Sequence, residues 1–108
     1  WGTSPADAAA RLVEAGADIV GCNCGNGGPA RVPAILAEMR KATSGFLAAY
    51  PNAGIPRVIG DKTVYDSTPD DMASAFQAIV SAGARIVGAC CGSTPDHIRK
   101  IAQTVRGL

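Results

Sequence analysis

Apolar residues recur along the chain in two patterns, one typical of amphipathic helices and one typical of buried strands. Four stretches carry apolar residues at helical spacing. They predict helices over 5–15, 30–43, 69–82 and 95–106. Three short segments between them are almost wholly apolar. They predict strands over 17–23, 46–50 and 84–90. Strands of this kind are typical of a parallel sheet that helices cover.

A repeated local signal marks the start of three of these helices. Ser4, Thr68 and Thr94 are each followed by proline and by an acidic residue within the first turn. A hydroxyl at the N-cap accepts a hydrogen bond from the first turn, proline fits the first helical position, and negative charge is favourable there. Helices are therefore expected to begin at these prolines.

The first and last strand regions are copies of one another. Val13–Gly21 aligns with Val80–Gly88, and the same offset of 67 residues places Cys24 on Cys91. Half of this offset is about the length of one strand and one helix, as in a βα repeat. We therefore expect the first and third strands to lie two apart in one parallel sheet, with their carboxyl ends on the same rim.

This order of elements predicts an α/β fold, either a doubly wound sheet or part of a (β/α)8 barrel. A complete barrel takes about 250 residues, so 108 residues would form under half of one. Both architectures place chemistry at the carboxyl ends of the strands. Residues 53–67 are expected to be a long connection before the third helix.

Composition narrows the classes of function. The formal net charge of +1 argues against a nucleic-acid-binding or membrane-anchoring surface. The apolar runs are too short to span a bilayer. The chain opens at Trp1 with neither an initiating methionine nor a secretory signal. We expect a cytoplasmic protein, and a segment of a longer one.

Three cysteines lie where strands end, and they are the strongest candidates for functional residues. Cys24 follows the first strand, and Cys90 and Cys91 end the third. Three thiolates on one rim suit a tetrahedral zinc ion with one position open for water or substrate. Cys22, inside the strand, is expected to be a small buried residue. His97 is a further possible ligand, but its place in the first turn of a helix favours a surface position.

Other interpretations of these residues remain open. The cysteines could be ordinary core residues, a disulfide framework or a redox pair, although no CxxC motif opens a helix here. Asn52, after the middle strand, is either a turn former or a polar group directed into the same site. The glycine-rich segment 25–28 could bind an anion, but it is better explained as a flexible loop beside Cys24.

Taken together, the motifs resemble a known family. Gly21-Cys22-Asn23-Cys24, Pro51-Asn52-Ala53-Gly54 and the segment 88–98 are similar to the zinc signature of the homocysteine S-methyltransferases. Ala89 and Ser93 stand where the family usually has glycine and threonine. The resemblance implies a partial (β/α)8 TIM barrel, with residues 1–108 as the C-terminal part of a homocysteine-binding domain, about strands 6 to 8.

The resemblance also implies a reaction. Zinc held by Cys24, Cys90 and Cys91 would activate the thiol of homocysteine, Asn52 would contact the substrate, and the product would be methionine. No protein residue acts as a catalytic acid or base in this scheme. Family members take the methyl group from a methylated corrinoid, betaine or S-methylmethionine, and a methylated corrinoid (cobalamin) would be supplied by another domain or protein. The alternative is an inactive zinc-binding or structural fragment, which we expect to self-associate.

Overall fold

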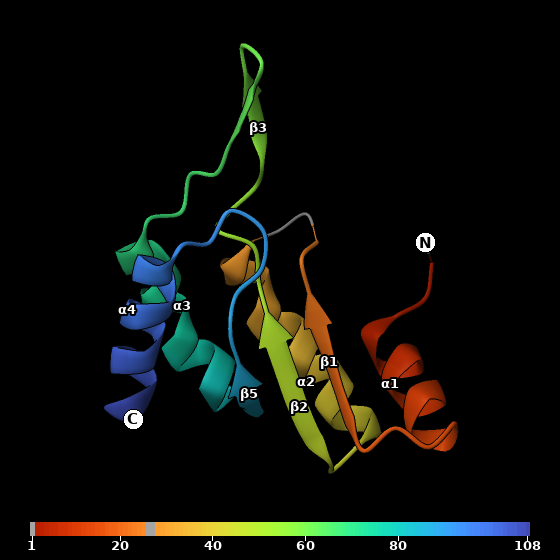
Figure 1. Cartoon of the computed structure of the whole chain (residues 1–108). Helices are drawn as coiled ribbons and strands as arrows, with labels where there is room; N and C mark the ends of the chain where they lie inside the picture. The colour runs from red at the N-terminus through yellow and green to blue at the C-terminus, as the bar shows by residue number, and fades with distance from the viewer. Residues whose placement is uncertain (1, 26–27) are drawn as a thin grey trace.

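The computed structural model describes residues 2–25 and 28–108 and shows an α/β body with a projecting hairpin (Figure 1). In chain order the elements are α1 (Pro5–Glu14), β1 (Ile19–Asn23), the 3-10 turn η1 (Pro29–Arg31), α2 (Val32–Ala42), β2 (Phe46–Tyr50), β3 (Arg57–Ile59), β4 (Lys62–Val64), α3 (Pro69–Ser81), β5 (Ala84–Val87) and α4 (Pro95–Arg106). Every predicted helix and strand is present, with ends that differ from the prediction by up to three residues.

The helix starts follow the predicted signal. The Ser4 hydroxyl accepts a hydrogen bond from the Asp7 backbone N–H at 3.1 Å. Thr68 and Asp71 form a reciprocal capping box at the start of α3, in which each side chain accepts from the other residue's backbone N–H. These caps satisfy N–H groups that have no partner inside the helix, so the local sequence fixes where the helices begin.

The three strands of the body form one parallel sheet in the order β1-β2-β5. Ile19 pairs with Phe46 at one end of the β1-β2 ladder, and Asn23 pairs with Tyr50 at the other. The prediction that the first and third strands lie two apart is therefore confirmed. All three carboxyl ends meet at one rim, below the hairpin in Figure 1.

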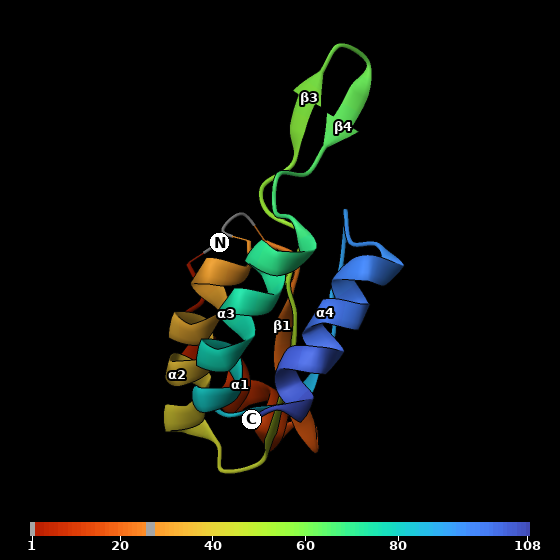
Figure 2. The same cartoon turned by 90° about the vertical axis from the view of Figure 1, so that its left-hand side faces the viewer.

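The two faces of this sheet have different surroundings. Helices α2 and α3 lie against one face and are flanked by α1 and α4 (Figure 2). Val20, Leu47 and Ala49 point into this covered face. Its largest fully buried partners are Phe76, Leu36, Met72 and Ile79. On the opposite face Ile19 is 46% exposed and Phe46 is 62% exposed. We call this opposite side the open face.

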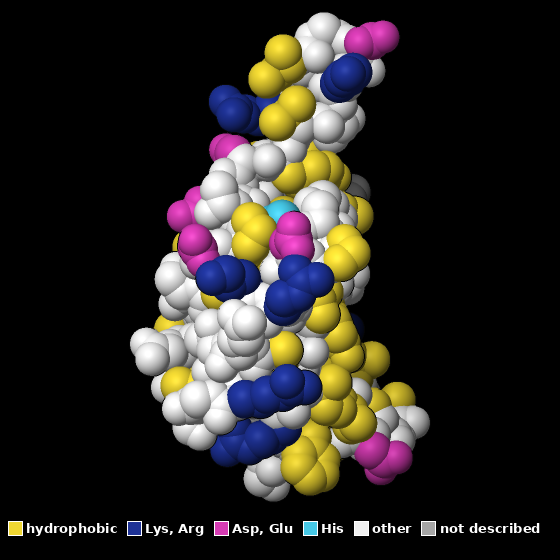
Figure 3. Space-filling model, turned by 60° about the vertical axis from the view of Figure 1, so that its left-hand side comes forward, with side chains coloured by type: hydrophobic (Ala, Val, Ile, Leu, Met, Phe, Trp, Pro, Cys, Tyr) yellow, Lys and Arg dark blue, Asp and Glu magenta, His cyan; other side chains and the backbone are white. Residues whose placement is uncertain are grey.

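The connection over 53–67 is more ordered than expected. It contains the antiparallel hairpin β3-β4, in which Val58 pairs with Thr63, and this hairpin projects from the body (Figures 1 and 2). Its turn includes Gly60, whose φ of +66° suits glycine. Each strand has only three residues, too few for alternation to reveal it in the sequence. Hydrophobic and basic side chains lie side by side on the hairpin (Figure 3).

The architecture is therefore α/β, with four helices and a three-stranded parallel sheet, an arrangement compatible with part of a barrel. Within the described ranges, none of the helices is long and apolar enough to cross a membrane.

Candidate metal centre

The cysteines after β1 and β5 converge at the carboxyl rim of the sheet. The Sγ atoms of Cys24 and Cys91 lie 3.8 Å apart, and those of Cys90 and Cys91 lie 3.9 Å apart. All three Sγ atoms lie within 4.8 Å of one another, a group that could hold a metal ion. The structure thus brings together the three residues that the sequence selected.

Backbone hydrogen bonds from the end of β2 hold the two cysteine loops. The Cys24 N–H donates to the Tyr50 carbonyl at 3.1 Å, and the Cys90 N–H donates to the Pro51 carbonyl at 2.8 Å. The Ala53 N–H donates to the Cys91 carbonyl at 2.9 Å. The middle strand contributes no cysteine, but its end fixes the loops on both sides.

Cys24 has an unusual backbone conformation that redirects its side chain. Its φ is +55°, and it is the only described residue other than glycine with a positive φ. This left-handed conformation is uncommon for residues that have a Cβ atom. It ends the regular alternation of β1 directly after Asn23, so that Cys24 can turn its thiol toward the β5 loop.

The spacing of the sulfur atoms fits the requirements of zinc. Zinc–sulfur bonds are about 2.3 Å long and tetrahedral sites are the rule, which places sulfur ligands about 3.8 Å apart. The two separations of 3.8 and 3.9 Å match this value. Because all three donors are thiols, the set favours a soft or borderline ion such as zinc over magnesium or calcium.

The thiols influence one another's ionisation. Hydrogen bonding to Cys90, burial and the neighbouring thiols raise the pKa of Cys24 to about 11. The pKa of Cys90 is lowered, first because the Cys24 thiol donates a hydrogen bond to it, and also because the Cys91 backbone and the Asn23 side chain donate. Without metal, these hydrogen bonds therefore favour the thiolate form of Cys90 over that of Cys24.

Cys22 lies outside the cluster although only one residue separates it from Cys24. Its side chain is half-buried and packs against the hydrophobic core on the covered face. Burial raises the pKa of its thiol. This placement agrees with the prediction of a small apolar role.

Asn52 is buried between the two cysteine loops. Its Oδ1 accepts a hydrogen bond from the Cys91 N–H at 3.1 Å, and its Nδ2 donates to the Gly25 carbonyl at 3.3 Å. Only 6% of the residue is exposed. The side chain therefore connects the loop that carries Cys91 to the loop that follows Cys24, and its contact with substrate stays a prediction. Asn26 and Gly27, in the glycine-rich segment, lie outside the described residues.

The surface position predicted for His97 is wrong. The residue is 6% exposed. Its Nδ1 accepts a hydrogen bond from the Thr94 N–H at 3.1 Å, so Nε2 carries the proton and donates to the Ser67 carbonyl at 2.8 Å. Both ring nitrogens are engaged away from the cysteines, and His97 instead joins the start of α4 to the base of the hairpin.

Two side chains beside the cluster were not among the residues predicted from the sequence. The Asn23 Nδ2 donates hydrogen bonds to the Sγ atoms of Cys24 and Cys90. The Tyr65 ring packs against Gly92 so closely that it leaves no room for a Cβ atom there. Burial raises the pKa of Tyr65, and the charge of Cys91 raises it further. Asn23 could have been noticed from its place next to Cys24, whereas Tyr65 reaches the site only through tertiary structure.

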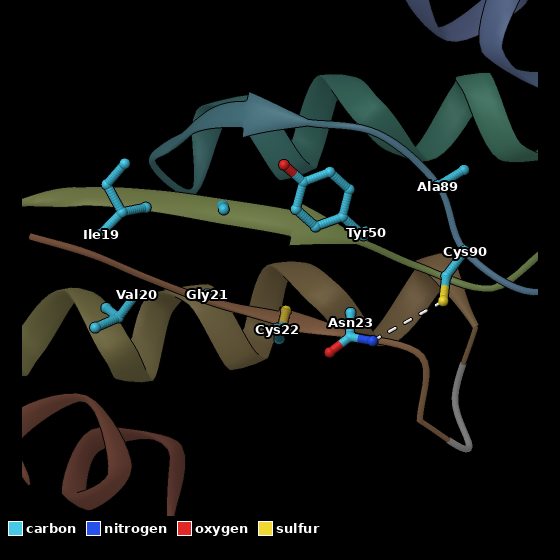
Figure 4. Close-up of a pocket in the computed structure, with 9 residues that line it drawn as sticks. Ile19, Val20, Gly21, Cys22, Asn23, Tyr50, Ala89 and Cys90 are labelled. Carbon is cyan, nitrogen blue, oxygen red and sulfur yellow. Dashed lines mark hydrogen bonds between the residues drawn. The ribbon is translucent and has the colours of Figure 1, made fainter. Parts of the chain in front are cut away.

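A cavity of about 410 Å³ opens beside the cluster on the open face of the sheet. Ile19, Ala48 and Tyr50 line its apolar part, and Asn23 and Cys90 line the end nearest the other cysteines (Figure 4). The cluster therefore borders a space that is apolar at one end and has Asn23 and Cys90 at the other, the kind of lining that small-molecule sites have.

Comparisons with known proteins show to which proteins this chain is similar. Residues 1–105 match the family described as homocysteine S-methyltransferase. Methionine synthase of Mycobacterium leprae (strain TN) is 40% identical to the chain over 92 residues. That alignment covers 83% of this chain and 8% of the methionine synthase, so the chain spans a small part of that relative's length.

Proposed function

Because the chain belongs to the homocysteine S-methyltransferase family, we propose that it forms the zinc-binding part of an enzyme that methylates the thiol of homocysteine and releases methionine. Residues 1–108 would be the C-terminal part of a (β/α)8 barrel, contributing about strands 6 to 8. The observation that carries the proposal is the triangle of Sγ atoms, with two sides of 3.8 and 3.9 Å.

In this proposal Cys24, Cys90 and Cys91 supply three thiolates and leave the fourth position for the substrate. A bound zinc ion would keep the substrate thiol deprotonated near neutral pH, where a free thiol with a pKa of about 8.5 is mostly protonated. The residues of this chain contribute by holding the cysteine ligands in position. The end of β2 holds the two cysteine loops, so the ligands need little rearrangement when the substrate arrives.

We propose that Asn52 affects substrate binding through these loops. Its two hydrogen bonds, to the Cys91 N–H and the Gly25 carbonyl, support this role. In Asn52→Ala, the concentration of homocysteine needed for half-maximal rate should rise more than the zinc content falls. Unchanged kinetics would return Asn52 to the role of a turn former.

The methyl donor is proposed to come from another domain or protein. The Cys91 side chain is exposed at the rim, so a donor such as a methylated corrinoid could approach from the solvent side. Assays of methionine formation with methylcobalamin, betaine and S-methylmethionine as alternative donors would identify its class.

The decisive experiment uses the full-length protein that contains this chain. We expect one equivalent of zinc and methionine formation from homocysteine. Removal of zinc with a chelator should abolish turnover, and zinc should restore it. Full turnover by the metal-free protein would contradict the proposal.

We propose that the 108-residue chain by itself turns over little and self-associates. Ile19 and Phe46 on its open face are 46% and 62% exposed, and apolar surface of this kind favours association. Sedimentation velocity of the isolated chain, combined with a methionine assay, tests this. A monomer with full turnover would overturn it.

A further inference from the structure

Asn23, the last residue of β1, directs its side-chain amide at two of the three clustered cysteines. Its Nδ2 lies 3.4 Å from the Cys24 Sγ and 3.9 Å from the Cys90 Sγ, within hydrogen-bonding range for sulfur acceptors. Figure 4 shows the contact with Cys90 at the end of the cavity. Asn23 makes no hydrogen bond to Cys91 among those that the structure describes.

The backbone explains why this amide reaches both loops. Asn23 lies on the open face, because side chains alternate along β1 and its neighbour Cys22 packs against the core. Cys24 then turns back through its left-handed conformation. The amide therefore lies between a cysteine of its own loop and a cysteine that is 67 positions later in the sequence.

An amide N–H that donates to a thiolate changes the chemistry of that sulfur. It attracts part of the lone-pair density, so the sulfur becomes a weaker nucleophile while it remains a ligand. Outer-shell donors of this kind also orient metal ligands. The described contacts of the Asn23 amide go to Cys24 and Cys90, so a homocysteine sulfur in the fourth position would keep more of its lone-pair density, and the methyl group would then meet sulfur atoms of unequal reactivity.

We propose that Asn23 is a positioning residue that holds the Cys24 and Cys90 thiolates and suppresses their alkylation, so that the methyl group is directed to the substrate sulfur. This inference rests on the proposed function. Through Asn23, the protein would protect its own cysteines from the methylation reaction that they support. A residue that only ended the strand would have no such effect on sulfur reactivity.

The test treats the zinc-loaded full-length protein with methyl iodide, with and without homocysteine. In each reaction a thiolate lone pair forms the new sulfur–carbon bond while the carbon–iodine bond breaks, and iodide leaves with the electron pair. Peptide mass spectrometry then measures methylation at Cys24, Cys90 and Cys91 separately. Cys91 is an internal comparator, because Asn23 does not donate to it.

In Asn23→Ala we expect methylation of Cys24 and Cys90, relative to Cys91, to rise about tenfold, within the range for loss of an outer-shell partner. Asn23→Asp, which keeps the shape but replaces the N–H donor, should show the same change. Asn23→Ser, which keeps a hydroxyl donor, should lie closer to wild type. Gln103→Ala, which removes an exposed amide on α4, is the matched control and should change nothing.

A second readout is independent of alkylation. In the cobalt-substituted protein, loss of the N–H donor should move the thiolate-to-cobalt charge-transfer band to lower energy in Asn23→Ala and Asn23→Asp. Unchanged methylation ratios and an unchanged band in zinc- or cobalt-loaded variants would overturn the role of Asn23. If the wild-type protein bound neither metal, the proposed function itself would fail, and this result is distinct from the first.

Discussion

The covered face of the sheet and the carboxyl rim are built from the same strands, but they are held together in different ways. Val20, Leu47 and Ala49 are buried against helices and need only apolar contacts. Cys24 and Cys91, at the rim, are held by backbone hydrogen bonds, a positive φ and polar neighbours. Apolar burial on the covered face is therefore expected to contribute most of the stability, whereas the proposed metal site lies at the rim. Substitutions in the two regions should therefore have different effects on unfolding and on zinc binding.

The largest effect should come from removing a cysteine at the rim. Cys91→Ser replaces a thiolate with a poor ligand for zinc, so zinc affinity should fall by more than the roughly 10- to 100-fold that loss of an outer-shell partner costs. The free energy of unfolding of the metal-free protein should change little, because Cys91 is exposed. Metal analysis and chemical denaturation measure both quantities. Wild-type zinc content in this variant would remove Cys91 from the ligand set.

A substitution in the core should show the reverse pattern. Phe76 is fully buried on α3, so Phe76→Ala should lower the free energy of unfolding by about 3 to 5 kcal/mol through lost contacts and the cavity left behind. The fraction that remains folded should still bind zinc with wild-type stoichiometry. A variant that was fully folded but lacked zinc would contradict the separation of core and rim.

The pH dependence of zinc affinity should reflect the thiols at the rim and not the apolar side chains of the covered face. Zinc binds thiolates and releases their protons, and the pKa of Cys24 is raised to about 11 in the metal-free cluster. Zinc affinity should therefore increase as the pH rises toward that value and decrease as the pH falls, by about tenfold per pH unit for each proton released. Competition titrations with a chelator from pH 6 to pH 8 would measure the slope. A flat profile would exclude thiols as the ligands.

The smallest effect is expected for the cysteine between the two regions. Cys22→Ser places a hydroxyl where the thiol packs against the core, so a loss of about 1 kcal/mol in unfolding free energy is expected. Zinc content should stay near that of the wild type. Because Cys22 and Cys24 belong to one short segment, a matched Cys24→Ser variant provides the contrast. Similar zinc loss in both variants would mean that Cys22 also acts as a ligand.

Much of the covered face could be predicted from the sequence, because it depends on local signals. A serine or threonine followed by proline predicted the starts of α1, α3 and α4, and apolar runs predicted the three strands of the body. The 67-residue repeat predicted the strand order, and with it the meeting of Cys24 with Cys91. These inferences need only the period of the pattern and the rules for parallel sheets.

The other features of the site and the fold depend on contacts between distant parts of the chain, and the local sequence does not predict such contacts. His97 has the local pattern of an exposed first turn, but the Ser67 carbonyl from a separate segment buries it. Tyr65 reaches Gly92 only because the hairpin base folds back onto the β5 loop. The hairpin was missed because its strands are too short to show alternation.

The position of β2 between the two cysteine-bearing strands has a consequence for the order of folding. Cys24 and Cys91 are 67 residues apart, and contacts of high sequence separation form slowly because a long loop must first close. The three candidate sulfur ligands come together only when β1 and β5 have both joined β2. Metal capture should therefore be a late step in folding, and the rate of zinc uptake during refolding would report completion of the sheet.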